Sequence, residues 1–325
     1  MPTRMTTDTS YRKINLEFLN NSGDEYFDIF YKARSYGTVK YVRFATSKPE
    51  HHEKVVRLLE SGDPLEDFYI QEEDLFKYYR HATTTLRKIV ANPEISFEKK
   101  AKKVYEVSKN IMREFFEYNA SEKMLRTSDE VMEIMEECFR DYDISFFGIS
   151  KITNKDYYTY THSVNVALYC MTYGVKIKMN HDEVRMLGLG GMLHDVGKSK
   201  ISNTILNKKG LLTPQEFDTV KNHAPLGGEI LNKMKCYAHS VVDMATQHHE
   251  KYKGGGYPQG IIGEEISYFA RICKVMDVYD ALTTRRSYKK AMNPFDTLTL
   301  MKKQMSDEFD AKILDNFIQY MGPEL

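Results

Sequence analysis

The stretch Leu193-His194-Asp195-Val196-Gly197-Lys198 lies in a C-terminal half whose apolar residues predict almost continuous helix with short connections. His194 and Asp195 can offer two metal ligands from one turn of the chain, and Lys198 adds a cation suited to a phosphate. Alone, this pair has a simpler interpretation as the solvated end of a helix. Its function therefore depends on residues that lie elsewhere in the chain.

The composition is that of an ordinary globular protein rather than a disordered or fibrous one. The 325 residues include 46 basic and 46 acidic side chains and are 42% hydrophobic, which suits about two domains with their own cores. A net charge of zero gives no overall attraction to a nucleic acid polymer or to an anionic membrane. The cysteines are well separated, which favours free thiols in a reducing compartment. The sequence shows no signal peptide and no run near the ~20 apolar residues that span a bilayer. It therefore predicts a cytoplasmic protein without a membrane span.

The chain is predicted to be mostly α-helical, with a small α/β module near its N-terminus. Apolar residues follow helical spacing from Glu72 onward and alternate in short runs before it. The helices of the middle segment are expected to face a core, and a dimer stalk that relays a signal is the alternative. The predicted segments are a loose leader (1–25), a small α/β module (26–92), connecting helices (93–143) and an all-helical C-terminal domain (144–325).

Three short strands and one helix are predicted in the α/β module. Tyr26–Lys32 and Val39–Ala45 are rich in aromatic and β-branched residues at period two, which predicts a hairpin. Apolar residues at helical spacing predict a helix over His51–Ser61. Asp67–Ile70 can form one more strand.

A capped, glycine-rich helix is predicted directly before the quoted stretch. Asn180 precedes Glu183 by three positions, which is the spacing of a capping box at a helix start. The same helix carries Gly188, Gly190 and Gly191, and glycine inside a helix costs up to ~1 kcal/mol relative to alanine. We therefore expect the backbone of a neighbouring helix to approach closely here.

Seven side chains of the C-terminal half are candidate metal ligands. His162 falls on the inner face of an amphipathic helix, where it would be costly unless paired or bound to metal, although a satisfied core histidine is the alternative. His248 and His249 can reach one ion only at a helix end, and the glycines at 254–256 mark such a turn before Tyr257, an aromatic suited to stacking on a base. The candidates are His162, His194, Asp195, His223, His248, His249 and Asp277.

Residues 145–325 resemble an HD-GYP domain, a subgroup of the HD-superfamily metal-dependent phosphohydrolases that hydrolyse cyclic di-GMP. The resemblance covers some 180 residues, and its motifs occur in the order of the family. They are His162, His194-Asp195-Val196-Gly197-Lys198, Asn222-His223-Ala224-Pro225-Leu226-Gly227, His248-His249-Glu250, Gly256-Tyr257-Pro258, Val275-Met276-Asp277-Val278-Tyr279-Asp280-Ala281-Leu282-Thr283, Arg286 and Tyr288-Lys289.

The resemblance implies two metal sites that share one carboxylate. From it we expect a centre of two divalent ions, which would be Fe or, as the alternative, Mn. A hydroxide that bridges the two ions would attack the phosphorus of the substrate. The first site would consist of His162, His194, Asp195 and Asp277, and the second of His223, His248 and His249, with Asp195 bridging.

Four further residues are expected to act on the substrate. Lys198 would neutralise charge on the phosphoryl oxygens, and Tyr257 would contact the nucleotide. Arg286 and Lys289 would grip a phosphate, since both match the family at these positions. Without that match, they would be interpreted as part of a solvated basic turn.

Three positions depart from the pattern of the family. Tyr158 occupies the position of a glutamate that supports a third metal in some members, so two metals are expected rather than three. Lys253 replaces the usual aspartate ahead of the Gly-Tyr-Pro loop, which predicts a more flexible and more basic loop. Ser287 replaces a common proline, which is a mild change.

The predicted function is a cyclic di-GMP phosphodiesterase that its N-terminal module regulates. One alternative is a slow or silent domain that binds cyclic di-GMP and signals through a partner, which the altered loop at Lys253 suggests. Another is an HD phosphohydrolase of a different nucleotide. A protein partner at the Gly-Tyr-Pro loop and a homodimer are further expectations.

Overall fold

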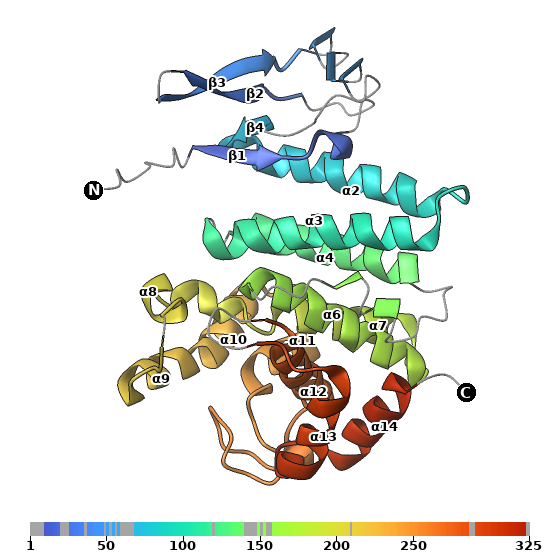
Figure 1. Ribbon diagram of the computed structural model, residues 1–325, viewed down its shortest axis with the longest axis vertical. Coiled ribbons are helices and arrows are strands. Elements are labelled where there is room, and N and C mark those ends of the chain that lie inside the picture. Colours follow the sequence, from blue (N-terminus) through green and yellow to red (C-terminus); the bar gives the residue numbers. More distant parts are fainter. Residues whose placement is uncertain are drawn as a thin grey trace. The chain divides into compact units, whose positions relative to one another are not determined.

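The structure is a computed structural model in which the chain forms two compact units, Met1–Ile95 and Ser96–Leu325. It describes residues 10–19, 26–35, 38–48, 50–51, 54–55, 57–58, 68–118, 121–139, 148–149, 152–153, 158–208, 210–285 and 290–322. The described residues are mostly helical, with one small antiparallel sheet near the N-terminus, which confirms the predicted fold class (Figure 1).

The first unit combines a four-stranded antiparallel sheet with one long helix. The strands are β1 (Tyr11–Ile14), β2 (Ile29–Ser35), β3 (Thr38–Ala45) and β4 (Phe68–Gln71), in the order β1-β4-β2-β3. Two 3₁₀ turns, η1 (Leu16–Phe18) and η2 (Glu72–Asp74), flank the sheet, and α2 (Leu75–Ala91) follows. Leu16, Phe18 and Leu86 are fully buried, so η1 and α2 share one core.

The predicted hairpin is confirmed, because β2 pairs with β3 in antiparallel register from Ile29 opposite Ala45 to Ser35 opposite Thr38. The predicted last strand is confirmed as β4. Of the predicted helix over 51–61, residues 51, 54–55 and 57–58 are helical, and the others lie outside the described residues.

Residues 11–19 differ from the predicted loose leader, because they form β1 and η1. Tyr11 pairs with Gln71 and Ile14 with Phe68, so the partner of β1 lies far away in the sequence. A strand this short shows almost no alternation by itself. Residues 1–9 and 20–25 of the predicted leader lie outside the described residues.

In its described part, the second unit consists of helices joined by turns and loops. It begins with α3 (Phe97–Glu117) and α4 (Glu122–Phe139), which pack on each other and on α6 and α7. The remaining elements are α6 (Thr159–Lys176), α7 (His181–Leu193), η3 (Val196–Lys200), α8 (Asn203–Leu206), α9 (Pro214–Lys221), α10 (His223–Met234), α11 (His239–Gln247), η4 (Gly263–Glu265), α12 (Tyr268–Thr283), α13 (Pro294–Gln304), η5 (Ser306–Glu308) and α14 (Ala311–Met321).

The apolar faces of α3 and α4 are buried, as expected for helices that face a core. Val104 and Ile111 of α3 and Val131 and Ile134 of α4 are fully inaccessible to solvent. Burial of each such side chain contributes about 1.5–3 kcal/mol to folding. These helices therefore belong to the same hydrophobic core as the helices that carry the candidate ligands.

The glycines of α7 allow close packing just before His194. A Cβ at Gly191 would lie 3.0 Å from Cα of Ala167 on α6, which confirms the predicted backbone approach at that position. At Gly188 and Gly190, methionine side chains occupy the space that a Cβ would fill. The predicted capping box is also present, since Asn180 and Glu183 exchange two hydrogen bonds of 3.0 Å.

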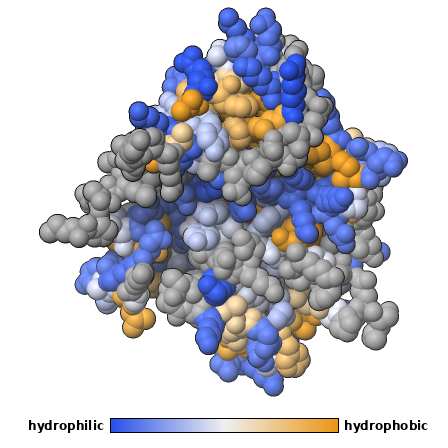
Figure 2. Space-filling view, turned by 45° about the horizontal axis from the view of Figure 1, so that its top comes forward, coloured by the Kyte–Doolittle hydropathy of each residue, from blue (hydrophilic) through white to orange (hydrophobic). Residues whose placement is uncertain are grey.

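Hydrophobic and hydrophilic residues are interspersed on the face drawn in Figure 2. Within the described part of the chain, no helix combines the length and the apolar character that crossing a membrane requires.

Candidate metal centre

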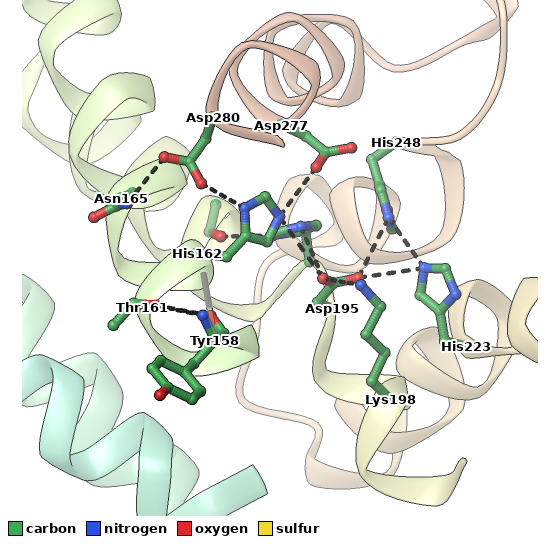
Figure 3. Close-up of polar contacts among 12 residues, drawn as sticks. Tyr158, Thr161, His162, Asn165, Asp195, Lys198, His223, His248, Asp277 and Asp280 are labelled. Atoms are coloured by element: carbon green, nitrogen blue, oxygen red, sulfur yellow. Dashed lines mark hydrogen bonds and ion pairs between the residues drawn. The ribbon is translucent and has the colours of Figure 1, made fainter. Parts of the chain in front are cut away.

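The candidate ligands converge from separate elements onto one buried point (Figure 3). His162 lies on α6, Asp277 on α12, and His223 is the first residue of α10. His194 and Asp195 follow α7, and His248 and His249 follow α11. Two groups of potential ligand atoms form there, each with its atoms within 4.8 Å of one another: His162, His194 and Asp195, and Asp195, His223, His248 and His249.

The absence of a side chain at Gly197 allows α10 to lie next to the end of α7. A Cβ at this position would lie 1.9 Å from the carbonyl oxygen of His223, so only glycine fits. This contact between η3 and α10 places His223 Nε2 3.3 Å from Asp195 Oδ1. The glycine of the His-Asp motif is therefore a packing requirement of the centre.

His162, His194 and Asp277 form what we call the carboxylate half of the centre. His162 Nε2 lies 3.1 Å from Asp277 Oδ1, and its Nδ1 lies 2.7 Å from Oδ2 of the buried Asp280. Burial, which lowers the pKa of His162, is outweighed by its hydrogen bonds with Asp277 and Asp280, which raise that pKa to about 9. A carboxylate behind an imidazole is the usual way to orient a metal-binding histidine.

His194 is held from its other side by the backbone. Its Nδ1 donates to the carbonyl oxygen of Gly191 at 2.8 Å, which leaves Nε2 directed at Asp195 Oδ2, 3.4 Å away. Burial lowers the pKa of His194, but the carboxylate of Asp195 outweighs it and raises the pKa to about 9.

His223, His248 and His249 form the imidazole half. Nδ1 of His223 donates to the carbonyl of Val220 at 2.6 Å, and Nδ1 of His248 donates to that of Met244 at 2.9 Å. Burial lowers the pKa to about 4 for His223 and about 3 for His249, and lowers that of His248 well below its usual range. These rings are therefore neutral at pH 7, which is the state that binds metal.

Asp195 lies between the two halves and faces each with a different oxygen. Oδ1 is 3.3 Å from His223 Nε2 and 3.8 Å from His248 Nε2, whereas Oδ2 is 3.4 Å from His194 Nε2. Lys198 Nζ also donates to Oδ2, at 2.5 Å. Burial raises the pKa of Asp195, but Lys198 and the histidines outweigh it, and the pKa falls well below its usual range.

The residues present fit a metal by two independent observations. The Nδ1 atoms of His223 and His248 both donate to backbone carbonyls, so in the neutral rings the Nε2 atoms carry lone pairs instead of protons. These two Nε2 atoms lie 3.2 Å apart, and their lone pairs therefore face one point. Among the described residues, the buried His194 Nε2 and Asp195 Oδ1 have no hydrogen-bond partner. Such arrangements are costly unless a cation lies between the atoms.

The candidate substrate residues are placed only in part. The ring of Tyr257 stacks on that of His249 at 4.6 Å, so one face of the aromatic is already covered, and Lys198 is half-buried beside Asp195. Arg286 and Lys289 lie outside the described residues.

Tyr158 caps the start of α6 and points away from the centre. Its side chain is 55% exposed, and its ring stacks on that of Tyr160 at 5.2 Å. Figure 3 shows its hydroxyl directed away from His162 and Asp195.

The loop after His249 is tied at several points, unlike the more flexible and more basic loop predicted from Lys253. Lys253 Nζ pairs with Asp307 Oδ1 at 2.5 Å, so its charge is compensated by a residue 54 positions away. The fully buried carboxylate of Glu250 accepts hydrogen bonds from the backbone of Gln259 at 2.7 Å and Gly260 at 3.0 Å.

Two polar residues of the centre were not predicted as site residues. Asp280 binds His162 with Oδ2, and its Oδ1 accepts from Asn165 Nδ2 at 2.9 Å. The spacing offered a signal, because Asp280 is three positions after Asp277 and Asn165 three after His162, which places each pair on one helix face.

Comparison with known proteins gives one family and a set of phosphodiesterases. The family model described as HD domain matches residues 149–313. Cyclic di-GMP phosphodiesterase PA4108 of Pseudomonas aeruginosa is 36% identical over 60% of this chain and 47% of its own length. The 3'3'-cGAMP-specific phosphodiesterase 3 of Vibrio cholerae is 30% identical over 73% of this chain and 52% of its own length. The chain thus spans about half the length of these relatives.

A solved structure shares the fold over most of the chain. It is that of Bd1817, an HDG"Y"P protein from Bdellovibrio bacteriovorus, with a TM-score of 0.66 over 95% of this chain and 98% of that one. The sequence identity is 15%, so this likeness concerns the fold alone.

Proposed function

This chain belongs to the HD domain family, and from that premise we propose that it is a metal-dependent phosphodiesterase of cyclic di-GMP. The observation that carries the proposal is the buried cluster in which Asp195 faces two separate sets of histidines with its two oxygens. Relatives named as cyclic di-GMP phosphodiesterases support the substrate class.

The two halves fit two divalent ions, with Asp195 as the shared ligand. His162, His194 and Asp277 would hold one ion and His223, His248 and His249 the other, and this mixed imidazole and carboxylate set suits Fe and also Mn. When bound, two such ions would supply a bridging hydroxide as the nucleophile and neutralise charge on the phosphodiester.

The remaining roles belong to side chains around the cluster. Lys198 lies next to Asp195, where its ammonium would neutralise charge on a phosphoryl oxygen as the 3′ oxygen departs. Tyr257, whose ring stacks on that of His249, would contact a base, and Arg286 and Lys289 would bind a phosphate of the substrate. We further propose that residues 26–92 regulate this activity in the cytoplasm, that a protein partner docks at the loop with Tyr257, and that the chain forms a homodimer.

The test begins with protein purified anaerobically, in which metals are counted and cyclic di-GMP is incubated while the linear product is followed. We expect about two ions per chain and hydrolysis that Asp195→Ala abolishes. The matched control is Asp315→Ala, which removes an exposed aspartate of α14 that pairs with Lys302, and it should hydrolyse at the wild-type rate. Tight binding of cyclic di-GMP without product under Fe and Mn would instead support a silent, signalling domain.

A second substrate is favoured by one relative. The 3'3'-cGAMP-specific phosphodiesterase 3 matches a larger share of this chain than the cyclic di-GMP phosphodiesterase PA4108 does. The same assay with 3'3'-cGAMP therefore decides between the two cyclic dinucleotides by comparing kcat/KM. A clear preference for 3'3'-cGAMP would overturn the choice of cyclic di-GMP and retain the metal-dependent chemistry.

A further inference from the structure

A chain of buried hydrogen bonds runs from α3 to the carboxylate half. Tyr105 Oη donates to Asn165 Oδ1 at 2.8 Å, and Asn165 Nδ2 donates to Asp280 Oδ1 at 2.9 Å. Asp280 Oδ2 then lies 2.7 Å from His162 Nδ1. Each of these four residues is at most 6% exposed, so water does not compete for the bonds. Three helices, α3, α6 and α12, are thus joined through the ligand.

The direction of every bond in this chain is fixed by chemistry. The carboxylate of Asp280 only accepts, so the amide of Asn165 must turn its NH₂ group toward it. The amide oxygen then faces α3, where only a donor can satisfy it, and the hydroxyl of Tyr105 supplies that donor. Removing this hydroxyl takes away a buried hydrogen bond to the amide oxygen, which is costly, and with it a bond that helps to fix the amide plane.

We propose that Tyr105 is a positioning residue for the metal ligand His162. It acts through Asn165 and Asp280, which fix the ring plane of His162 and the position of its Nε2 beside Asp277. The inference rests on the proposed function in one respect, which is that the cluster binds metal. Tyr105 lies on α3, outside residues 149–313, the part that the HD domain family model matches.

The position of Tyr105 links α3 to the chemistry of the centre. α3 is the first helix after Ile95, where the first compact unit ends. A shift of α3 that lengthens the bond from Tyr105 to Asn165 would loosen His162 while leaving the imidazole half in place. The carboxylate half is therefore the part whose metal affinity should respond to α3.

The experiment measures metal binding, not hydrolysis. Metal-stripped full-length protein is titrated with Mn²⁺ while the electron paramagnetic resonance signal of free Mn²⁺ is followed, for the wild type, Tyr105→Phe, Asn165→Ala and the double variant. We expect Tyr105→Phe to raise the dissociation constant of one of two sites about threefold, below the ~10-fold or more typical of groups bonded directly to a metal ligand, because Tyr105 acts through two further residues. In the Asn165→Ala background, Tyr105→Phe should add nothing, because the two residues act in one chain.

The matched control is Tyr237→Phe, which also removes a hydroxyl bonded within this unit, at 3.0 Å to the carbonyl of Leu125. It should leave both sites unchanged. An unchanged affinity in Tyr105→Phe, an equal loss at both sites, or independent effects of Tyr105→Phe and Asn165→Ala would each overturn the positioning role. If Tyr105→Phe failed to fold, Asn165→Ala would still test the same chain through the selective loss at one site.

The two proposals fail in different ways. A wild-type protein that binds no Mn²⁺ and no Fe²⁺ would overturn the proposed metal-dependent function and this inference with it. Normal binding by the wild type, with no selective effect of either variant, would overturn the role of Tyr105 alone.

Discussion

The two halves of the centre hold their histidines by different means. In the carboxylate half, His162 is backed by Asp280 and faces Asp277, and all three side chains are buried. In the imidazole half, His223 and His248 are backed by the backbone carbonyls of Val220 and Met244. One half thus brings its own negative charge, while the other brings neutral rings.

This difference teaches that one centre can contain two sites with different proton requirements. Metal binding needs deprotonated ligands. The pKa values of His162 and His194 are raised to about 9, so the proposed ion of that half would displace protons there, whereas the pKa values of His223 and His249 are lowered to about 4 and 3. Asp195 turns one oxygen toward each half and would therefore be the shared ligand of the two proposed sites.

The largest expected effect is the loss of the shared residue. Asp195→Asn should lower kcat/KM for the cyclic dinucleotide by about 10³-fold or more, since several kcal/mol of charge stabilisation depend on both ions. Metal analysis should show both sites weakened, whereas Asp277→Asn should weaken one. Equal metal loss in the two variants would show that Asp195 serves a single half.

Gly197→Ala should damage the imidazole half selectively. The new methyl group would lie 1.9 Å from the carbonyl oxygen of His223, and the backbone must move at a cost of about 3 kcal/mol. Thermal unfolding should show the lower stability, and Mn²⁺ titration should show the loss at one site. Gly227→Ala is the control, because its nearest contacts would be ordinary ones at 3.4 Å.

Asp280→Asn should damage the carboxylate half selectively. The variant removes the carboxylate behind His162, and loss of such an outer-shell partner typically lowers metal affinity about 10- to 100-fold. Isothermal titration with Mn²⁺ should show one weakened site and one unchanged site. If both sites changed together, the separation between the halves would be wrong.

The pH dependence of metal binding should separate the halves without any mutation. Below a pKa of about 9 an ion must displace a proton from His162 or His194, so affinity at the carboxylate half should rise with pH. The slope should be about tenfold per pH unit for each proton displaced. The imidazole half should be flat above about pH 5, because the pKa values of His223 and His249 are about 4 and 3. Proton release measured in two buffers by calorimetry checks this sign.

The sequence predicted the helical domain and the six side chains that form the two groups, together with Asp277 beside His162, because each candidate falls within a motif that can be read locally. Its limits lie in contacts between distant positions. Lys253 appeared to make its loop basic, but Asp307 compensates it from another element. β1 was missed because its pattern becomes visible only beside β4.

The role of Gly197 shows the same limit at closer range. A glycine in this motif suggests flexibility, yet its requirement comes from the carbonyl of His223 on α10. Likewise, Tyr105 carried the pattern of an ordinary core residue on α3, and its hydroxyl acquires a role only when Asn165 is placed opposite it. Local periodicity assigns such residues to a core but does not identify their polar partners.

The hydrogen bond between His162 and Asp280 joins positions that are 118 residues apart. During synthesis at about 5–20 residues per second, Asp280 emerges from the ribosome about 6 to 24 seconds after His162. Throughout that interval no carboxylate of Asp280 lies behind the imidazole of His162 in the nascent chain. The carboxylate half is therefore the part of the centre whose synthesis is completed last, and a chain truncated before α12 should lack Asp277 and Asp280 while it retains Asp195, His223, His248 and His249.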